Sequence, residues 1–318
     1  MDSAVRLVGD IGGTNARFAL VDAGSRQPRD ERTVKCADYP GLEQAIRDYL
    51  LGHGSPPVGE IALDVATGIT GDFVHLTNGP WGFSIEQTRK AFGLSRLHVI
   101  NDFTALALAV PTLTAAEVRK VGGGAPVPAT AIAVIGAGTG LGVSGLIPDD
   151  GGWRALQGEG GHTSFSPTSP REAAVLQHLW RTYDHVSTER VLSGMGLENL
   201  YRSLCEIDGL APASLDPAGI TRAGLEGRDA HCREALDMFC AILGAAAANL
   251  VMTLGAFGGC YIGGGIVPRF GAYFDASPFR ARFENKGRFR DYVAAVPTYV
   301  IEAATPALRG LATLFDAP

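Results

Sequence analysis

Two segments of the chain repeat one local pattern, an apolar strand followed by a glycine- and threonine-rich turn and a second apolar strand. The first runs from VRLV through the turn GDIGGTN (9–15) to ARFALV, and the second from AIAVI through GAGTGLG (136–142) to VSGLI. Glycine allows tight turns and a close approach of the backbone to a ligand, so each turn can offer amide groups to an anion. The repeat predicts two related halves that face one cleft.

Patterns typical of strands and helices alternate around these turns. Further strands are expected at 61–66, 73–76, 97–100 and 259–267. Helices are expected at 41–51, from a cap at Ser84 to about 92, from 103 to Pro111, from 170 after a cap at Ser169, near 196–206 and 231–254, and at 304–316. This mixture indicates an α/β protein. The 318 residues suggest two domains at about 150 residues each, and the glycine- and proline-rich segment 121–130 predicts a surface loop near their boundary.

Composition excludes several classes of protein. The net charge is −6, so no basic excess is available to neutralise a nucleic acid. The five cysteines form no CxxC pair, which argues against a disulfide framework or a thiolate zinc site and fits a reducing cytoplasm. The N-terminus has neither the basic nor the apolar region of a signal peptide. Residues 238–257 are long enough to span a membrane, but alanine and glycine dominate them and Asn249 interrupts them, so a buried helix that leads into a strand is expected.

The two turns are the first candidates for ligand binding. In GDIGGTN, Thr14 and Asn15 add donors to the glycine amides, and Asp10 can hold a hydrated magnesium ion. The alternative interpretation is an ordinary hairpin turn. GAGTGLG can bind a second phosphate or be a structural turn. A P-loop is excluded because none of the four lysines follows the required glycine pattern.

Acidic residues and one histidine are the candidates for catalysis and for binding a polyol. Asp102 follows Asn101 at the end of an expected strand, where the start of a helix favours a carboxylate that accepts a hydroxyl proton; the alternative is a plain helix cap. Glu159 and His162 in GEGGH suit a polyol, or belong to a solvated turn. Glu189 can join them, or cap a helix in a surface salt bridge.

Taken together, these motifs resemble the bacterial glucokinase family of the hexokinase and actin-like ATPase superfamily. The resemblance covers nearly the whole chain and rests on LVGDIGGTNARFAL, ITGD, INDFTA, GAGTGLGV, GEGGH, ERVLSG, GGGIVPRF and FENKGRF. The related sugar-kinase class with a cysteine-rich zinc motif does not fit, because TSFSPTSP follows His162. Two departures flank the sugar loops: Thr163 and Ser164 replace the Val and Asp of relatives, and Met195 stands where Pro is frequent.

The resemblance implies a duplicated ribonuclease-H-like fold with two domains around a deep cleft, residues 1–112 plus 301–318 and residues 113–300. It implies ATP and Mg²⁺, D-glucose as the acceptor at its 6-hydroxyl, a homodimer in the cytoplasm, and no nucleic-acid or membrane partner. Asp102 is then the catalytic base. The implied sugar ligands are Asn101, Asp102, Glu159, His162 and Glu189. The implied ATP-binding residues are Asp10, Gly12, Gly13, Thr14 and Asn15 in the first loop, Gly138, Thr139 and Gly140 in the second, and Gly263, Gly264 and Gly265 at the adenosine.

Two other functions stay open at this point. One is a sugar-sensing protein without catalytic activity, which would be expected to have a damaged turn or an added DNA-binding module; the turns are intact, and the chain starts directly at its first strand. The other is a kinase of another hexose, or one that uses another phosphoryl donor such as polyphosphate.

Overall fold

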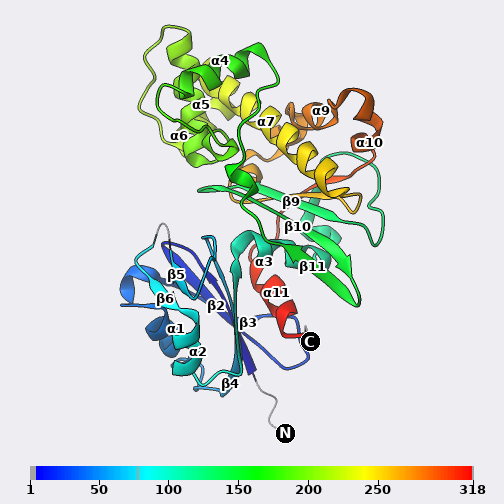
Figure 1. Cartoon of the computed structure of the whole chain (residues 1–318). Coiled ribbons are helices and arrows are strands. Elements are labelled where there is room, and N and C mark those ends of the chain that lie inside the picture. The colour runs from blue at the N-terminus through cyan, green and yellow to red at the C-terminus, as the bar shows by residue number, and fades with distance from the viewer. Residues whose placement is uncertain (1–4, 77–78, 317–318) are drawn as a thin grey trace. The chain divides into compact units, whose positions relative to one another are not determined.

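The computed structural model describes residues 5–76 and 79–316 (Figure 1). The contacts between residues divide the chain into two compact units. The smaller unit comprises Met1–Thr114 and Ala303–Pro318, and the larger unit comprises Ala115–Glu302. The glycine- and proline-rich segment predicted as a loop at 121–130 has no regular secondary structure from 121 to 131, and it lies in the larger unit close to its first residue, Ala115.

The smaller unit is built on a five-stranded sheet in the order β3-β2-β1-β4-β7. Its strands are β1 (Val5–Ile11), β2 (Asn15–Val21), β3 (Arg29–Lys35), β4 (Val58–Val65) and β7 (Arg96–Asn101). The first three strands form an antiparallel meander, whereas β4 pairs parallel with both β1 and β7. The central strands are apolar on both faces, as expected for parallel strands that helices cover on both sides.

The larger unit repeats this arrangement in a six-stranded sheet, in the order β11-β10-β9-β12-β13-β8. Its strands are β8 (Val118–Lys120), β9 (Ile132–Ala137), β10 (Leu141–Asp149), β11 (Gly152–Leu156), β12 (Cys260–Gly263) and β13 (Thr298–Ile301). Again three strands form an antiparallel meander and β12 pairs parallel with β9 and β13. The predicted α/β class with a duplicated ribonuclease-H-like sheet is therefore confirmed.

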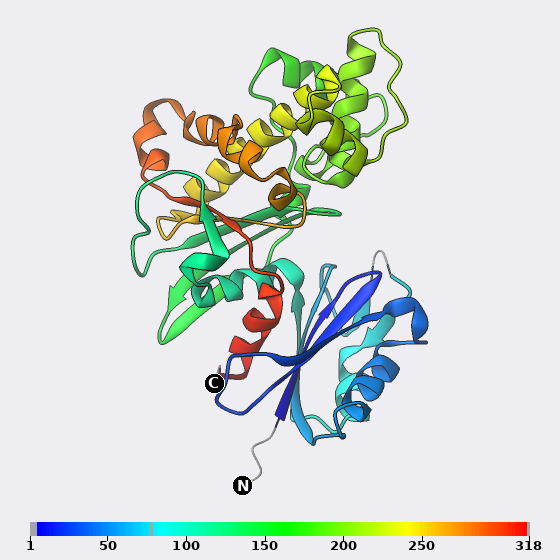
Figure 2. The same ribbon diagram turned by 180° about the vertical axis from the view of Figure 1, so that it is seen from behind.

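Helices cover both faces of the smaller sheet (Figures 1 and 2). On one face, α1 (Leu42–Leu51) buries Ala45, Ile46 and Tyr49 against the sheet, and α2 (Ile85–Ala91) lies beside it. On the other face, α3 (Asp102–Ala109) and α11 (Pro306–Ala312) pack against each other. They pack closely because Gly310 has no side chain: a Cβ atom there would lie 1.9 Å from the carbonyl oxygen of Ala105.

The core helix of the larger unit is α7 (Ala230–Leu254), which begins at the Asp229 cap and ends at Gly255 with a φ of 62°. Among the described residues it is the one helix long and apolar enough to cross a membrane, but 72% of its apolar stretch is buried inside the protein. It packs against α5 (Gly194–Ile207), α6 (Pro217–Leu225) and α9 (Phe279–Glu284), and the chain then enters β12. The predicted buried helix that leads into a strand is confirmed.

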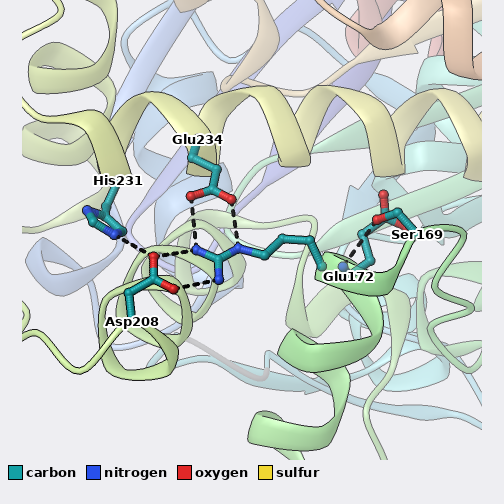
Figure 3. A network of polar contacts seen from close by, with 6 residues as sticks. Ser169, Glu172, Asp208, His231 and Glu234 are labelled. Atoms are coloured by element: carbon teal, nitrogen blue, oxygen red, sulfur yellow. Dashed lines mark hydrogen bonds and ion pairs between the residues drawn. The ribbon is translucent and has the colours of Figure 1, made fainter.

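A polar network ties α7 to its neighbours (Figure 3). Arg171, on α4 (Pro170–Leu179), bonds both oxygens of Asp208 at 2.7 Å and Glu234 at 2.8 Å. His231 also contacts Asp208, at 3.0 Å. The hydrogen bonds from Arg171 are the main reason that the pKa of Asp208 is well below its usual value. The network therefore links three helices through charges that are already compensated.

The structure corrects several predicted boundaries. The first strand continues through Asp10 to Ile11, and the strand predicted at 259–267 ends at Gly263, because Gly264 adopts a φ of +80°. Both predicted serine caps are confirmed: Ser84 accepts the Gln87 amide proton, and Ser169 accepts that of Glu172. The strand predicted at 73–76 is confirmed as β5 (Phe73–His75). The elements that sequence reasoning missed are β3, β8, β11, β13, α6, α9, the strand β6 (Gly82–Ser84) that pairs with β5, and the short helices α8 (Ala272–Ala276) and α10 (Arg290–Ala294).

The contact between α3 and α11 gives a stability prediction. Replacing Gly310 by Ala would gain about 1 kcal/mol of helix propensity, but the new Cβ meets a backbone oxygen that cannot move aside. We expect Gly310→Ala to lower the free energy of unfolding by about 1–2 kcal/mol net, measured by urea denaturation. Gly59→Ala is the matched control, since its Cβ meets no atom within 4 Å. Equal stability of the two variants would show that the helices can separate without cost.

Candidate active site

Acidic residues gather where the strands of the smaller sheet end. Asp10 on β1 pairs in register with Asp64 on β4 and with Arg17 on β2, so these three side chains share one face of the sheet. The nearest contact between the carboxylate of Asp10 and the guanidinium of Arg17 is 3.4 Å. The chain then leaves β7 at Asn101 and enters α3 at Asp102. In the register of β4 with β7, Val65 lies opposite Asn101, so Asp102 follows at the end of the sheet where β4 carries Asp64.

Asn101 and Asp102 share the start of α3. The side-chain oxygen of Asn101 accepts the amide proton of Phe103 at 2.9 Å, and Oδ1 of Asp102 accepts the same proton at 2.8 Å. Asn101, rather than Asp102, is therefore the helix cap. The positive end of the helix favours a negative charge on Asp102. Such a fixed carboxylate can accept a proton from a hydroxyl group.

Asp64 is an acid that sequence reasoning missed. Its side chain is fully buried, and neither carboxyl oxygen has a hydrogen-bond partner among residues 5–76 and 79–316. Burial, and after it the charges of Asp10 and Asp102, raise its pKa well above the usual value, and the charge of Arg17 opposes them. The one available signal was an acid inside the apolar run IALDV. That signal does not say which carboxylates lie on the adjacent strands.

The first glycine turn joins β1 to β2 as a hairpin, a shape that both interpretations of this turn share. The amide of Gly12 donates to the carbonyl of Asn15 at 3.0 Å, and the carbonyl of Thr14 accepts from Cys36 at 2.9 Å. Thr14 and Asn15 are exposed. Gly79 lies against Gly13, because a Cβ on Gly79 would lie 2.9 Å from the Cα atom and from the carbonyl oxygen of Gly13. The role of this turn in phosphate binding stays a prediction.

In the larger unit, the second turn lies beside the third glycine cluster. The turn spans Gly138 to Gly140 between β9 and β10, and the amide of Gly138 donates to the carbonyl of Gly140 at 2.8 Å. At the ends of β9 and β12, a Cβ on Gly136 would lie 2.2 Å from the oxygen of Gly263. A Cβ on Gly264 would lie 2.3 Å from the oxygen of Ala137. Glycine is required here because two backbone segments touch.

Glu189 is tied to the second turn. Its Oε2 atom accepts the amide proton of Leu141 at 2.8 Å, and a Cβ on Gly140 would lie 2.5 Å from the same oxygen. The alternative was a helix cap in a surface salt bridge. The cap of α5 is Ser193, whose hydroxyl accepts the amide proton of Gly196, and the guanidinium of the adjacent Arg190 lies over the ring of Tyr183. Glycine at 140 thus allows the carboxylate to reach the start of β10.

The loop that carries Glu159 and His162 is fixed to the segment that carries Glu189. Both side chains are exposed, and the amide of His162 donates to the carbonyl of Glu159 at 3.0 Å. One residue further on, the carbonyl of Thr163 accepts from the amide of Thr188 at 2.8 Å and from its hydroxyl at 3.0 Å. The structure therefore brings together three of the predicted sugar ligands within one unit, on neighbouring segments.

Two other features of the larger unit do not resemble a catalytic site. A cavity of about 250 Å³ lies between α7 and the 158–166 loop, and its lining contains no charged side chain. Asp208, His231 and Glu234 form the one group in the described part of the chain whose spacing suits a metal ion. The guanidinium of Arg171 already donates hydrogen bonds to both carboxylates, so its own positive charge compensates them.

Comparison with known proteins identifies a single family. A family model described as Glucokinase matches residues 7–318. A protein named Glucokinase from Chromobacterium violaceum is 55% identical over 307 residues, which cover 96% of this chain and 88% of that protein. A protein of the same name from Aromatoleum aromaticum is 49% identical over 318 residues, which cover 99% of this chain and 96% of that protein.

Solved structures agree with this comparison. A crystal structure of a glucokinase from an Antarctic psychrotroph superposes with a TM-score of 0.90 at 36% identity, and the match covers 98% of this chain and 99% of that chain. A glucokinase from Balamuthia mandrillaris in complex with glucose gives a TM-score of 0.79 at 20% identity, covering 99% of this chain and 94% of that one. At that identity the likeness concerns the fold alone.

The buried acid gives a prediction about pH. Because the folded-state pKa of Asp64 is raised, the unfolded chain loses this proton at a lower pH than the folded protein does, and stability falls as the pH rises above the ordinary value near 4. Asp64→Asn removes this pH-dependent loss of stability, because an amide side chain does not titrate. We expect the variant to have a higher urea midpoint than the wild type at pH 7, with a smaller difference at pH 4.

Asp72→Asn is the matched control, because Asp72 accepts the amide proton of Glu86 at 2.8 Å instead of lacking a partner. We expect that variant to be less stable at neutral pH. A neutral-pH loss of stability in Asp64→Asn as large as that in Asp72→Asn would contradict the account of Asp64.

Proposed function

This chain belongs to the glucokinase family and catalyses ATP-dependent phosphorylation of glucose, and from that premise we propose how its residues carry out the reaction. The γ-phosphoryl group of ATP passes to the 6-hydroxyl of D-glucose, and Asp102 is the general base. The observation that carries this assignment is the position of Asp102 in the first turn of α3, held by the amide of Phe103 beside the Asn101 cap.

The proposed step is an in-line displacement. The carboxylate of Asp102 accepts the proton of the sugar hydroxyl while that oxygen bonds the γ-phosphorus, and the bond from phosphorus to the bridging oxygen of ADP breaks. A base of this kind contributes about 10²–10⁴ to the rate. The backbone hydrogen bond fixes the direction of the carboxylate before the sugar arrives, so little reorganisation is needed during the reaction.

The remaining sugar hydroxyls are assigned to Asn101, Glu159, His162 and Glu189. Support for Glu159, His162 and Glu189 comes from the hydrogen bonds between Thr163 and Thr188, which hold their two segments at a fixed spacing. Carboxylates accept from two hydroxyls at once, and histidine can donate or accept. A site that bonds each hydroxyl discriminates strongly against a sugar that lacks one.

ATP is assigned to the three glycine segments. Gly12, Gly13, Thr14 and Asn15 would bind phosphate in the smaller unit, and Gly138, Thr139 and Gly140 would do so in the larger. Gly263, Gly264 and Gly265 would lie against the adenosine. The contacts of Gly136 with Gly263 and of Gly264 with Ala137 support the last two assignments, since they place both segments at one edge of the sheet.

Magnesium fits the residues at the end of β1. The carboxylate of Asp10 is partly exposed at the end of the strand and contacts the guanidinium of Arg17 at 3.4 Å. Oxygen ligands of this kind suit Mg²⁺, which keeps several of its waters. When bound, the ion would offset negative charge on the phosphates of ATP.

Domain limits, location and assembly complete the proposal. The domains are residues 1–112 with 301–318, and residues 113–300. We assign the protein to the cytoplasm, which is consistent with five buried cysteines that form no disulfide. We also propose a homodimer, which light scattering in solution can test.

The assignment of Asp102 is tested by Asp102→Asn. The amide keeps the size of the side chain and its acceptor oxygen but cannot take the proton, so we expect kcat to fall by about 10²–10⁴. Glucose binding, measured by calorimetry, should change by less than about tenfold, since an amide oxygen still accepts hydrogen bonds. Asp72→Asn, in the same unit, is the control and should retain kcat. A near-wild-type kcat in Asp102→Asn would exclude Asp102 as the base.

The sugar ligands are tested by epimer kinetics on Glu159→Gln and His162→Ala. Each variant loses hydrogen bonds to particular hydroxyls, so we expect the preference for glucose over mannose or galactose to fall by about tenfold or more in kcat/KM. Glu226→Gln, an exposed acid at the end of α6, serves as the control. Unchanged epimer preference in both loop variants would remove these residues from the sugar site.

A further inference from the structure

The start of α5 carries a serine to which the proposed reaction assigns no role. Ser193 is fully buried and lies four residues after Glu189, one of the proposed sugar ligands. Its hydroxyl donates to the carbonyl oxygen of Glu189 at 2.8 Å and accepts the amide proton of Gly196 at 2.9 Å. A serine hydroxyl has a single proton to donate, so these two bonds fix its direction.

We propose that Ser193 is a positioning residue of the sugar site, which holds the backbone of Glu189 where its carboxylate can accept a sugar hydroxyl. The inference rests on the proposed function, which assigns Glu189 to the sugar. It adds a residue that, in this role, touches neither sugar nor ATP and acts through the main chain of a ligand. Supports of this kind keep a binding group close to its productive geometry.

The backbone around Glu189 is held from outside its own short turn. Glu189 lies in the 3-10 turn Thr188–Arg190, which is followed directly by the segment that leads into α5. The hydroxyl of Ser193 donates to the carbonyl of Glu189, and the side-chain amide of Asn199 donates to the carbonyl of Arg190 at 2.9 Å. Two side chains from the start of α5 therefore hold two consecutive carbonyl groups of the turn.

Gly196 brings α5 into direct contact with the same segment. A Cβ on Gly196 would lie 2.6 Å from the carbonyl carbon of Val191 and 3.0 Å from the carbonyl oxygen of Glu189. The helix itself is anchored in the core of the larger unit, where Leu197 and Leu200 are fully buried. The place of the Glu189 backbone is thus set by a packed helix rather than by a free loop.

The residue after Ser193 contacts the proposed phosphate turn, independently of the serine hydroxyl. The amide of Gly194 donates to the carbonyl of Gly138 at 2.9 Å. The carboxylate of Glu189 accepts from the amide of Leu141 at 2.8 Å. Removing the hydroxyl of Ser193 releases the backbone of Glu189 but leaves the bond between Gly194 and Gly138. The proposal therefore predicts a larger effect on glucose than on ATP.

The simpler interpretation of Ser193 is an ordinary helix cap. The neighbouring helices show what a cap requires, since Asp216 caps α6 and Asp229 caps α7, each by accepting one amide proton. An ionised carboxylate has no proton to give to a carbonyl group, whereas a hydroxyl can accept and donate at once. A cap alone affects stability. A positioning role also affects the binding of glucose, which makes the two interpretations separable.

The test is Ser193→Gly, with kcat and both KM values measured. Glycine is tolerated at helix caps with little loss of stability, but it has no hydroxyl for the carbonyl of Glu189. We expect the KM for glucose to rise by about tenfold, with changes below about threefold in kcat and in the KM for ATP. Ser193→Ala should behave in the same way. Ser193→Thr keeps the hydroxyl and should have a KM for glucose near that of the wild type.

Ser169→Gly is the matched control. Ser169 caps α4 in the same unit, where it accepts the amide proton of Glu172 at 3.2 Å. This variant should lose stability as a cap variant does, measured by urea denaturation, and keep both KM values. A KM for glucose in Ser193→Gly and Ser193→Ala that equals that of Ser169→Gly would overturn the proposal. So would an equal rise of this KM in Ser193→Thr and Ser193→Gly, since the hydroxyl would then not be the cause.

A double-mutant cycle with Glu189→Ala shows whether Ser193 acts through Glu189. If it does, Ser193→Gly adds no further rise in the KM for glucose to that of Glu189→Ala, because the carboxylate to be positioned is already absent. A KM in the double variant that is the product of the two separate effects would overturn the proposal and leave Glu189 in the sugar site. An unchanged KM in Glu189→Ala would instead overturn the assignment of Glu189 in the proposed function, and this inference with it.

Discussion

The parallel pairing of β4 with both β1 and β7 is the constraint on which the chemistry of the smaller unit depends. Parallel strands end at the same edge of a sheet, and here the ends carry Asp10, Asn101 and Asp102. A helix must follow β7 because both faces of such a sheet need cover. Its first turn supplies the positive end that favours charge on Asp102. The contact of Gly310 with Ala105 then holds this helix against α11, so packing far along the chain fixes the direction of the candidate base.

The larger unit has a sheet of similar topology, but its glycine turn is held by a side chain from another segment. Its turn between β9 and β10 corresponds to the turn between β1 and β2, yet it is held from outside, by the carboxylate of Glu189 on the Leu141 amide. The hydrogen bonds of Thr188 to Thr163 extend this connection to the loop of Glu159 and His162. Hydrogen bonds therefore connect the proposed phosphate turn, through the Glu189 segment, to the proposed sugar loop. Glycine is required at position 140, because a Cβ there would lie 2.5 Å from the Glu189 carboxylate.

Local sequence was sufficient to predict part of this arrangement and insufficient for the rest. The turns, the caps at Ser84 and Ser169 and the acid before α3 depend on a few consecutive residues, so their patterns are visible in the sequence. The motif resemblance also led to the right family. Strands β3 and β13 were missed because charged or short segments become strands only through their partners. Asp64 was missed for a related reason: the sequence does not show which residues lie opposite an acid in an apolar strand, and the register places Asp64 opposite Asp10.

The acidic residues around Asp208 and those around Asp64 differ in how their burial is compensated. At Asp208 an arginine neutralises the acids, which lowers the pKa of Asp208 and links α4 to α7. At Asp64 no partner compensates for burial, and the repulsion from Asp10 and Asp102 raises the pKa of Asp64. A buried acid of this kind lowers the stability of the folded protein, because the pKa is raised only as far as burial and repulsion oppose the charge. The cluster that lacks a partner lies at the strand ends beside the candidate base, whereas the compensated cluster lies in the helical layer.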